Sequence, residues 1–153
     1  MHSLEQRIRE LEDRAELERV LLQYYTAVDT LADMDGLLAC FTPDALFDVA
    51  DLGLEVYRGH GAIRAFFQGV FADTRYHCHH VTNFHINHLA GDEAKARGYV
   101  IGKAEGRGGA SVFVHCCYDI TYVRTAQGWK ISVFDEDSLV PMGDEVSVLH
   151  GRR

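Results

Sequence analysis

A dense group of histidines lies in the middle of the chain and is the first candidate source of chemistry. Five of the nine histidines fall between Tyr76 and His88. If this segment is a strand, His77, His79 and Val81 share one of its faces, because alternate residues point to the same side. A neutral imidazole is the side chain that most often takes up a proton near neutral pH. This segment is therefore the candidate source of a general base.

Asp29 is the candidate partner for one of these imidazoles. In a helix predicted for the first thirty residues, it lies four residues after Tyr25 and seven after Leu22, on the apolar stripe. A carboxylate on that face needs a partner, because burying an unpaired charge is costly. A carboxylate that holds one ring nitrogen orients the imidazole and leaves the other nitrogen free as a base. The pattern predicts an Asp–His dyad that works without a cofactor.

A metal site is the competing interpretation. The spacing His77-x-His79 is one that two metal ligands use on a strand. Cupin-type metalloenzymes add a glutamate after three or four intervening residues, where this chain has Asn83 and Phe84. We therefore predict no bound metal and keep the metal enzyme as the less favoured alternative.

The later strands supply candidate walls for a cavity. Cys116 and Tyr118 share one face of an alternating segment, and that face can point into a cavity. A phenol beside a dyad can polarise a carbonyl group. The last predicted strand ends in the acidic run 135–137, which is typical of a solvated strand end. Within this run, Asp135 continues the face of Trp129 and is the one candidate for the cavity.

The elements that position these residues follow from periodicity and turn signals. A long helix, with Ser3 as its N-cap, covers the first thirty residues. Its predicted apolar stripe comprises Leu4, Ile8, Leu11, Ala15, Leu22, Tyr25 and Val28. Shorter helices are predicted over 35–41, where Pro43 ends the helix, and over 62–71. Strands are predicted over 45–49, 56–58, 76–88, 94–106, 111–124 and 129–139. This order favours an α+β fold, with helices packed on one face of a curved, mostly antiparallel sheet that encloses a pocket.

Composition limits the class of protein. The 153 residues are 47% hydrophobic and 25% charged, which is typical of one globular domain covering 1–153. The net charge of −8 disfavours nucleic-acid binding, which needs a basic surface. No apolar run approaches the roughly 18–20 residues that span a bilayer, and the N-terminus has no apolar signal core. We therefore expect a cytoplasmic protein without membrane partners.

The ordered set of motifs resembles SnoaL-like proteins of the nuclear-transport-factor-2-like, or ketosteroid-isomerase-like, superfamily. The segments that carry the resemblance are 24–29, 33–45, 57–59, 63–67, His79-x-x-x-Asn83 and 122–130. Within the superfamily, the chain is most similar to scytalone dehydratase, bile-acid dehydratases and hexachlorocyclohexane dehydrochlorinase. The resemblance implies a cone-shaped α+β barrel and a lyase or isomerase without a cofactor. It also implies that Asp29 and His79, rather than His77, form the dyad.

The resemblance leaves the substrate open, because Cys116 and Tyr118 stand where scytalone dehydratase has serine and asparagine. We expect a small, mostly apolar cyclic substrate. The candidate binding residues are Tyr25, Phe47, Asn83, Cys116 and Tyr118. The resemblance also implies a homo-oligomer, with a trimer favoured over a dimer, and residues 140–153 could cover the pocket mouth or a neighbouring subunit. A non-catalytic binding or structural subunit of an oxygenase or biosynthetic complex is the alternative function.

Overall fold

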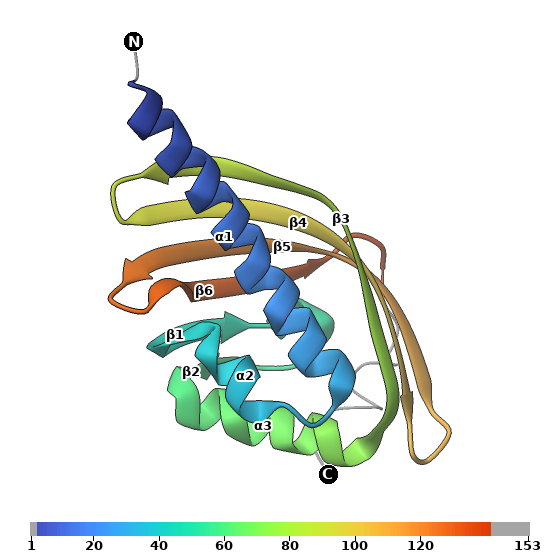
Figure 1. Cartoon of the computed structure of the whole chain (residues 1–153). Helices are drawn as coiled ribbons and strands as arrows, with labels where there is room; N and C mark the ends of the chain where they lie inside the picture. The colour runs from blue at the N-terminus through green and yellow to red at the C-terminus, as the bar shows by residue number, and fades with distance from the viewer. Residues whose placement is uncertain (1–2, 142–153) are drawn as a thin grey trace.

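The chain folds into three helices packed on one curved sheet (Figure 1). The structure, a computed structural model, describes residues 3–141; the predicted covering segment 140–153 lies almost wholly outside that range. The helices are α1 (Leu4–Thr30), α2 (Met34–Ala39) and α3 (Gly59–Asp73), and a short 3-10 helix, η1, covers Ala50–Leu52. The strands are β1 (Phe41–Asp48), β2 (Val56–Arg58), β3 (Thr74–Ala90), β4 (Glu93–Gly106), β5 (Ser111–Thr125) and β6 (Gly128–Ser138). Within residues 3–141, no helix is both long and apolar enough to cross a membrane.

The sheet confirms the predicted α+β class. Its strand order is β2-β1-β6-β5-β4-β3. All neighbouring strands are antiparallel except β1 and β6, which run parallel. The sheet is open in the described part of the chain, with β2 and β3 as its edges, so the expected barrel is a strongly curved sheet rather than a closed one. Helix α1 crosses the concave face, and α3 lies at the end of the cone near β1 and β2 (Figure 1).

The predicted N-cap of α1 is confirmed. The Ser3 hydroxyl accepts a hydrogen bond from the Gln6 backbone N–H, and the Gln6 side chain accepts one from the Ser3 backbone N–H. These reciprocal bonds form a capping box, which satisfies two donors that a helix start otherwise leaves free. The helix ends at Thr30, followed by Leu31 in a left-handed conformation (φ 53°). Asp29 therefore lies in the last turn.

The buried face of α1 differs in part from the predicted stripe. Leu4, Ile8, Leu11 and Leu22 are exposed. The first turns of the helix run beyond the β3–β4 hairpin, so no sheet lies beneath them (Figure 1). The residues of α1 that are buried are Asp13, Leu17, Val20, Leu21, Tyr24, Tyr25, Ala27 and Val28.

Asp13 fixes α1 on the sheet. One of its carboxylate oxygens accepts a hydrogen bond from Trp129 Nε1 at 3.0 Å, and the other accepts one from the Arg124 guanidinium at 2.7 Å. The Arg124 guanidinium also lies over the Trp129 ring, 4.4 Å from its centroid. These contacts join the helix to β5 and β6 and so fix where the far end of α1 presents Asp29.

The remaining predicted elements are found with shifted boundaries. The four long strands each lie within two residues of their predicted limits. The second helix ends at Ala39, before the predicted Phe41, and Pro43 lies inside β1 rather than ending a helix. Pro43 is tolerated there because the pairing of β1 with β6 is irregular between Phe41 and Leu46.

Candidate active site

Asp29 is placed by the last turn of α1, where it faces β3. A carboxylate at a helix C-terminus lies at the negative end of the helix dipole, so its ionised form needs other donors. The first of these is the His79 backbone N–H, which donates to Asp29 Oδ2 at 3.0 Å. This bond fixes the carboxylate against the strand.

Two imidazoles share the other oxygen of Asp29. His79 Nδ1 lies 2.7 Å from Asp29 Oδ1, and His77 Nδ1 lies 3.0 Å from the same oxygen. A carboxylate can only accept hydrogen bonds, so each Nδ1 carries the hydrogen; in a neutral ring of this tautomer, Nε2 keeps a free lone pair. The two rings are close neighbours, with centroids 4.5 Å apart. We call Asp29, His77 and His79 the Asp–His cluster.

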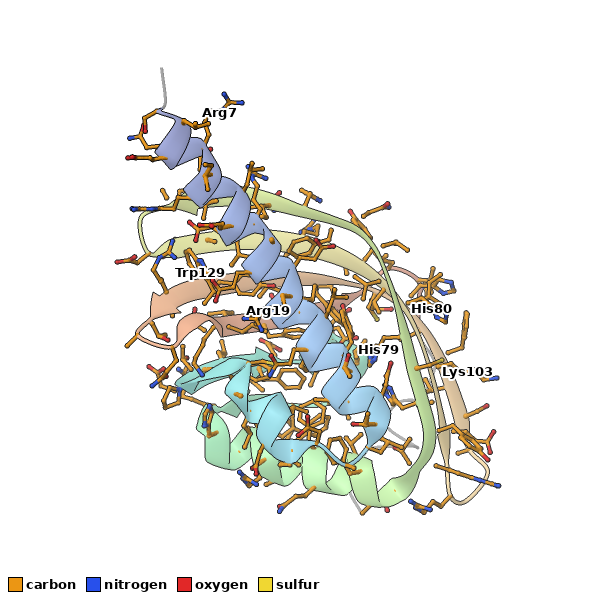
Figure 2. All side chains as sticks on the ribbon, viewed as in Figure 1. Arg7, Arg19, His79, His80, Lys103 and Trp129 are labelled. Atoms are coloured by element: carbon orange, nitrogen blue, oxygen red, sulfur yellow. The ribbon has the colours of Figure 1, made fainter. Side chains whose placement is uncertain are left out.

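The strand geometry sorts the histidines as the alternation predicts. His79 lies beside the C-terminal part of α1, whereas the next residue, His80, is exposed and lies on the outer side of β3 (Figure 2). The side chains of His79 and His77 are 7% and 13% exposed. Sequence reasoning selected His79 and set His77 aside, although both residues lie on the same strand face. The structure brings both to Asp29.

Burial and hydrogen bonding act in opposite directions on the cluster. Burial alone would raise the pKa of Asp29, but hydrogen bonds from His77 and His79 outweigh it and hold the pKa well below its usual range. Burial lowers the pKa of His79, and the hydrogen bond to Asp29 partly offsets that effect. The carboxylate is therefore ionised, and the His79 ring is neutral at neutral pH. A neutral ring with an oriented free Nε2 is able to accept a proton.

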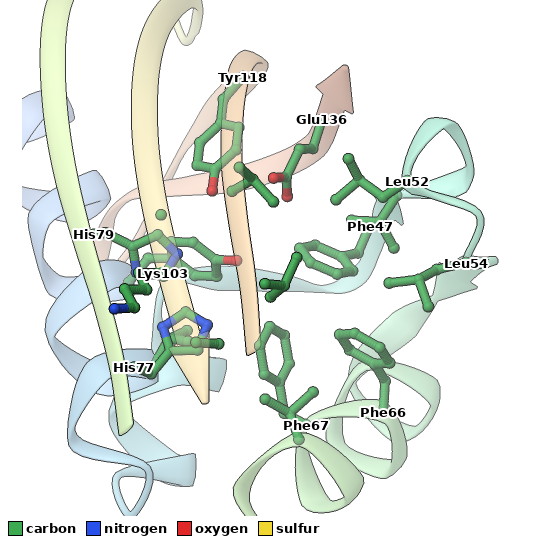
Figure 3. Close-up of a pocket in the computed structure, with 18 residues that line it drawn as sticks. Phe47, Leu52, Leu54, Phe66, Phe67, His77, His79, Lys103, Tyr118 and Glu136 are labelled. Atoms are coloured by element: carbon green, nitrogen blue, oxygen red, sulfur yellow. The ribbon is translucent and has the colours of Figure 1, made fainter. Parts of the chain in front are cut away.

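Both imidazoles line an apolar cavity between α1, α3 and the sheet (Figure 3). His77 and His79 point into it from β3, and aromatic and aliphatic side chains form the facing walls. Gly102 lies opposite His79 in the β3–β4 register. A Cβ atom at Gly102 would lie 2.9 Å from Val114 Cγ2, so this position has no room for a side chain. The other lining residues are Tyr24, Val28, Phe47, Val49, Leu52, Leu54, Phe66, Phe67, Val70, Lys103, Ala104, Val112, Val114, Tyr118 and Glu136.

The structure brings some of the predicted binding residues to the cavity and leaves others behind it. Phe47 and Tyr118 line the cavity. Tyr25 is buried behind the wall, with its ring centroid 4.8 Å from that of His79 and 5.7 Å from that of Tyr118. Cys116 is fully buried and is not among the lining residues. Tyr25 and Cys116 therefore support the wall and do not face the cavity.

Asn83 lies outside the cavity because β3 contains a bulge. Asn83 and Phe84 together oppose Gly98, and Asn83 has a left-handed backbone (φ 51°). Asparagine tolerates that conformation better than most residues do. The extra residue reverses the alternation, so Asn83 is exposed and Phe84 turns inward. The observed role of Asn83 is to bend β3 at the bulge.

Glu136 is the cavity residue that sequence reasoning missed. The acidic run was expected to be solvated, with Asp135 as its candidate for the cavity, but Glu136 is only 7% exposed and lines the cavity. The cause is a bulge in β6, where Ile131 pairs with Tyr122 and Val133 pairs with Thr121, leaving Ser132 unpaired. One extra residue exchanges the two faces of the strand beyond it. No local sequence signal marks this bulge.

The Asp–His cluster also satisfies the first requirement of a metal site. Its three ligand atoms lie within 4.8 Å of one another, and two imidazoles with a carboxylate form a donor set that divalent transition metals accept. The distances of 2.7 and 3.0 Å from the two Nδ1 atoms to one oxygen are hydrogen-bond lengths. In this structure the Asp29 carboxylate therefore accepts hydrogen bonds from two imidazole rings.

Comparison with known proteins places the chain in a family. Residues 9–135 match the SnoaL-like domain, so the chain belongs to the SnoaL-like family. A crystal structure from Novosphingobium aromaticivorans, named a putative aromatic ring hydroxylase, is 41% identical, with a TM-score of 0.84 over 87% of this chain and 93% of the other.

Two further solved structures share the fold at lower identity. The hexachlorocyclohexane dehydrochlorinase LinA-type3 from Novosphingobium barchaimii is 20% identical, with a TM-score of 0.77 over 87% of this chain and 90% of the other. A protein of Novosphingobium aromaticivorans named a putative scytalone dehydratase is also 20% identical, with a TM-score of 0.78 over 86% of this chain and 87% of the other.

Proposed function

We propose that this protein is a cofactor-independent lyase or isomerase that acts on a small, mostly apolar cyclic molecule. His79 removes a proton from a carbon atom next to a carbonyl group, and Asp29 orients the ring and stabilises the imidazolium that forms. The observation that carries the proposal is the 2.7 Å contact between His79 Nδ1 and Asp29 Oδ1 beside an apolar cavity. A dehydrochlorinase and a named dehydratase with the same fold are consistent with it.

A general base must be neutral and correctly oriented. The Asp29 carboxylate holds the hydrogen on His79 Nδ1, which leaves Nε2 as the acceptor. When Nε2 takes a proton, the ring becomes a cation next to an ionised carboxylate, and that ion pair is favourable. The aromatic walls favour a ring-shaped apolar substrate.

The test needs no knowledge of the natural substrate. In deuterium oxide, a base beside the cavity should exchange the α-hydrogens of cyclohexanone, and proton NMR measures the exchange rate. We expect His79→Gln and Asp29→Asn to lower the catalysed rate by about 100-fold or more, the usual contribution of a positioned base. His80→Gln is the matched control, because that side chain is exposed on the other face of β3.

The variant His77→Gln identifies which imidazole is the base. Both rings contact Asp29, so the proposal requires a larger loss in His79→Gln than in His77→Gln. A larger loss in His77→Gln would transfer the role to His77. Exchange at the wild-type rate in both His79→Gln and Asp29→Asn, with circular dichroism showing folded protein, would disprove the mechanism.

A second candidate function comes from the 41% identical relative, which is named for ring hydroxylation. In this alternative the chain is a binding or structural subunit of an oxygenase. Such a subunit needs a tight partner protein and no open cavity of its own, whereas this chain has a cavity lined by two imidazoles. Co-purification of the endogenous, untagged protein with an oxygenase subunit, together with absence of cyclohexanone exchange, would favour this alternative.

We also propose that the protein is a homo-oligomer, with a trimer favoured over a dimer. The outer face of the sheet carries apolar side chains, and Phe113 on β5 is 58% exposed there. Light scattering coupled to size-exclusion chromatography gives the mass directly. A monomer at micromolar concentration would contradict this proposal.

A further inference from the structure

Glu136 is a buried acid in an otherwise apolar part of the cavity wall. It reaches the cavity from the end of β6, next to Tyr118 and Leu52 and away from the two imidazoles (Figure 3). Its residue exposure is 7%. A carboxyl group in such a place is costly to ionise, and a buried acid beside a cavity is a candidate for proton transfer. The dyad mechanism makes no use of it.

Burial, not a charged neighbour, raises the pKa of Glu136. Cys116 and Tyr118 on β5 donate hydrogen bonds that favour the carboxylate, but burial outweighs them and raises the pKa of Glu136 to about 7. Tyr24 and Tyr25 on α1 are the other titratable groups that face it. Burial raises the pKa of all four neighbours, so they stay neutral and offer no charge to pair with a carboxylate.

The acidic residue of the adjoining η1 helix is engaged elsewhere. Asp51 is exposed, and its carboxylate accepts a hydrogen bond from the Ser138 backbone N–H. This bond holds the end of β6 just after Glu136. The end of β6 is therefore held beside η1, and the donors that the glutamate side chain contacts, Cys116 and Tyr118, are neutral.

We propose that Glu136 is the proton donor to the leaving oxygen of the substrate, which makes the reaction a dehydration and the substrate a cyclic β-hydroxy ketone. This inference rests on the proposed function, because His79 must first remove the α-proton. It adds the second proton transfer and selects one leaving group among those that a lyase can expel. A hydroxyl group leaves as water only when it is protonated, whereas a halide or a carboxylate leaves without a proton.

The step balances without an oxidant or reductant. His79 Nε2 takes the proton from the α-carbon, and the electron pair of that C–H bond forms the C=C bond. The bond from the β-carbon to oxygen breaks, and its electron pair goes to the oxygen as this atom takes the proton of Glu136. Water and an enone are the products. The His79 imidazolium then loses its proton to solvent, and Glu136 regains one.

Two substrates with the same ring and different leaving groups test the proposal. β-Hydroxycyclohexanone and β-acetoxycyclohexanone both give cyclohexenone, which NMR quantifies. Glu136→Gln keeps the shape and the hydrogen-bonding capacity of the side chain but cannot transfer a proton. We expect the ratio of kcat for the hydroxy substrate to kcat for the acetoxy substrate to fall by about 100-fold or more in this variant. A role in packing alone would change both rates alike.

The pH profile of the wild-type enzyme is the second measurement, and it does not depend on a variant. Turnover of the hydroxy substrate should fall as the pH rises through about 7, because Glu136 then loses the proton it donates. Turnover of the acetoxy substrate should lack this fall. An unchanged ratio in Glu136→Gln, or the same alkaline fall for both substrates, would overturn the inference.

The cyclohexanone exchange assay separates this inference from the proposed function. Wild-type protein that exchanges cyclohexanone but eliminates no water from β-hydroxycyclohexanone would overturn the role of Glu136 and leave that of His79 intact. Wild-type protein that neither exchanges cyclohexanone nor eliminates water would overturn the role of Glu136 and that of His79 together.

Discussion

The burial of Glu136 predicts that raising the pH destabilises the fold, and Glu136→Gln should remove this effect. The pKa of Glu136 is about 7 in the folded protein against 4.5 for a free glutamate. The folded state therefore holds a proton that the unfolded chain has already lost between these two values. Stability from this group is complete below about 4.5 and is lost as the pH rises through about 7.

The size of the effect follows from the separation of the two pKa values. Each pH unit over which the folded and unfolded states differ by one proton changes the free energy of unfolding by about 1.4 kcal/mol. A rise from 4.5 to about 7 therefore corresponds to about 3 kcal/mol, a large part of the 5–15 kcal/mol that is typical of a folded domain. Glutamine is neutral at every pH and keeps nearly the same volume. In the variant, position 136 therefore adds no pH dependence to the free energy of unfolding.

Urea unfolding followed by circular dichroism at pH 5 and pH 9 measures this change in the free energy of unfolding. Other groups titrate over this range, so the informative quantity is the difference between wild type and Glu136→Gln at each pH. We expect wild type to lose about 2.5 kcal/mol more than the variant between the two conditions, because part of the effect is already present at pH 5. Asp137→Asn, at the next and exposed position, controls for removing a charge from this strand end. Parallel curves for wild type and Glu136→Gln would show that the carboxylate is solvated and would refute the argument.

Three further predictions concern the dyad, the helix anchor and the metal alternative. In Asp29→Asn, the pKa of His79 should fall, because the hydrogen bond that raises it is lost. NMR titration of the ring signals measures this pKa. An unchanged pKa would mean that the two groups are uncoupled. Asp13→Ala should lower the free energy of unfolding in urea by about 1–3 kcal/mol, because a buried acceptor is removed. Asp92→Ala, which removes an exposed partner of Arg124, should cost less than about 1 kcal/mol, and equal losses would contradict the anchoring role of Asp13. Dialysis against a chelator should leave cyclohexanone exchange unchanged; a loss that added zinc restores would assign the Asp–His cluster to a metal.

The sequence predicted the elements well because their signals are local. The capping serine at position 3 is visible in the sequence alone, as are the turns that separate the four long strands. The α+β class follows from the order of these elements. Alternation along β3 also placed His77 and His79 on one face, helix periodicity indicated Asp29 as a partner, and the resemblance to SnoaL-like proteins selected His79. The structure brings these two side chains into contact.

Other features depend on how distant segments meet. The first turns of α1 have the spacing of a buried stripe, but Leu4 and Leu11 are exposed because the sheet does not extend beneath them. The second imidazole on Asp29, from His77, required the actual distance between α1 and β3.

The bulges decided the rest of the site. Along a strand, periodicity identifies a face only until an extra residue exchanges the two faces. The bulge at Asn83 turned that side chain out of the cavity, and the bulge at Ser132 turned Glu136 in, where the sequence favoured Asp135. A bulge bends its strand to fit the curvature of the whole sheet, and that curvature depends on the packing of every strand and helix. The sequence alone therefore determined the elements and indicated Asp29 and His79. The tertiary structure decided which acid of the run 135–137 faces the cavity.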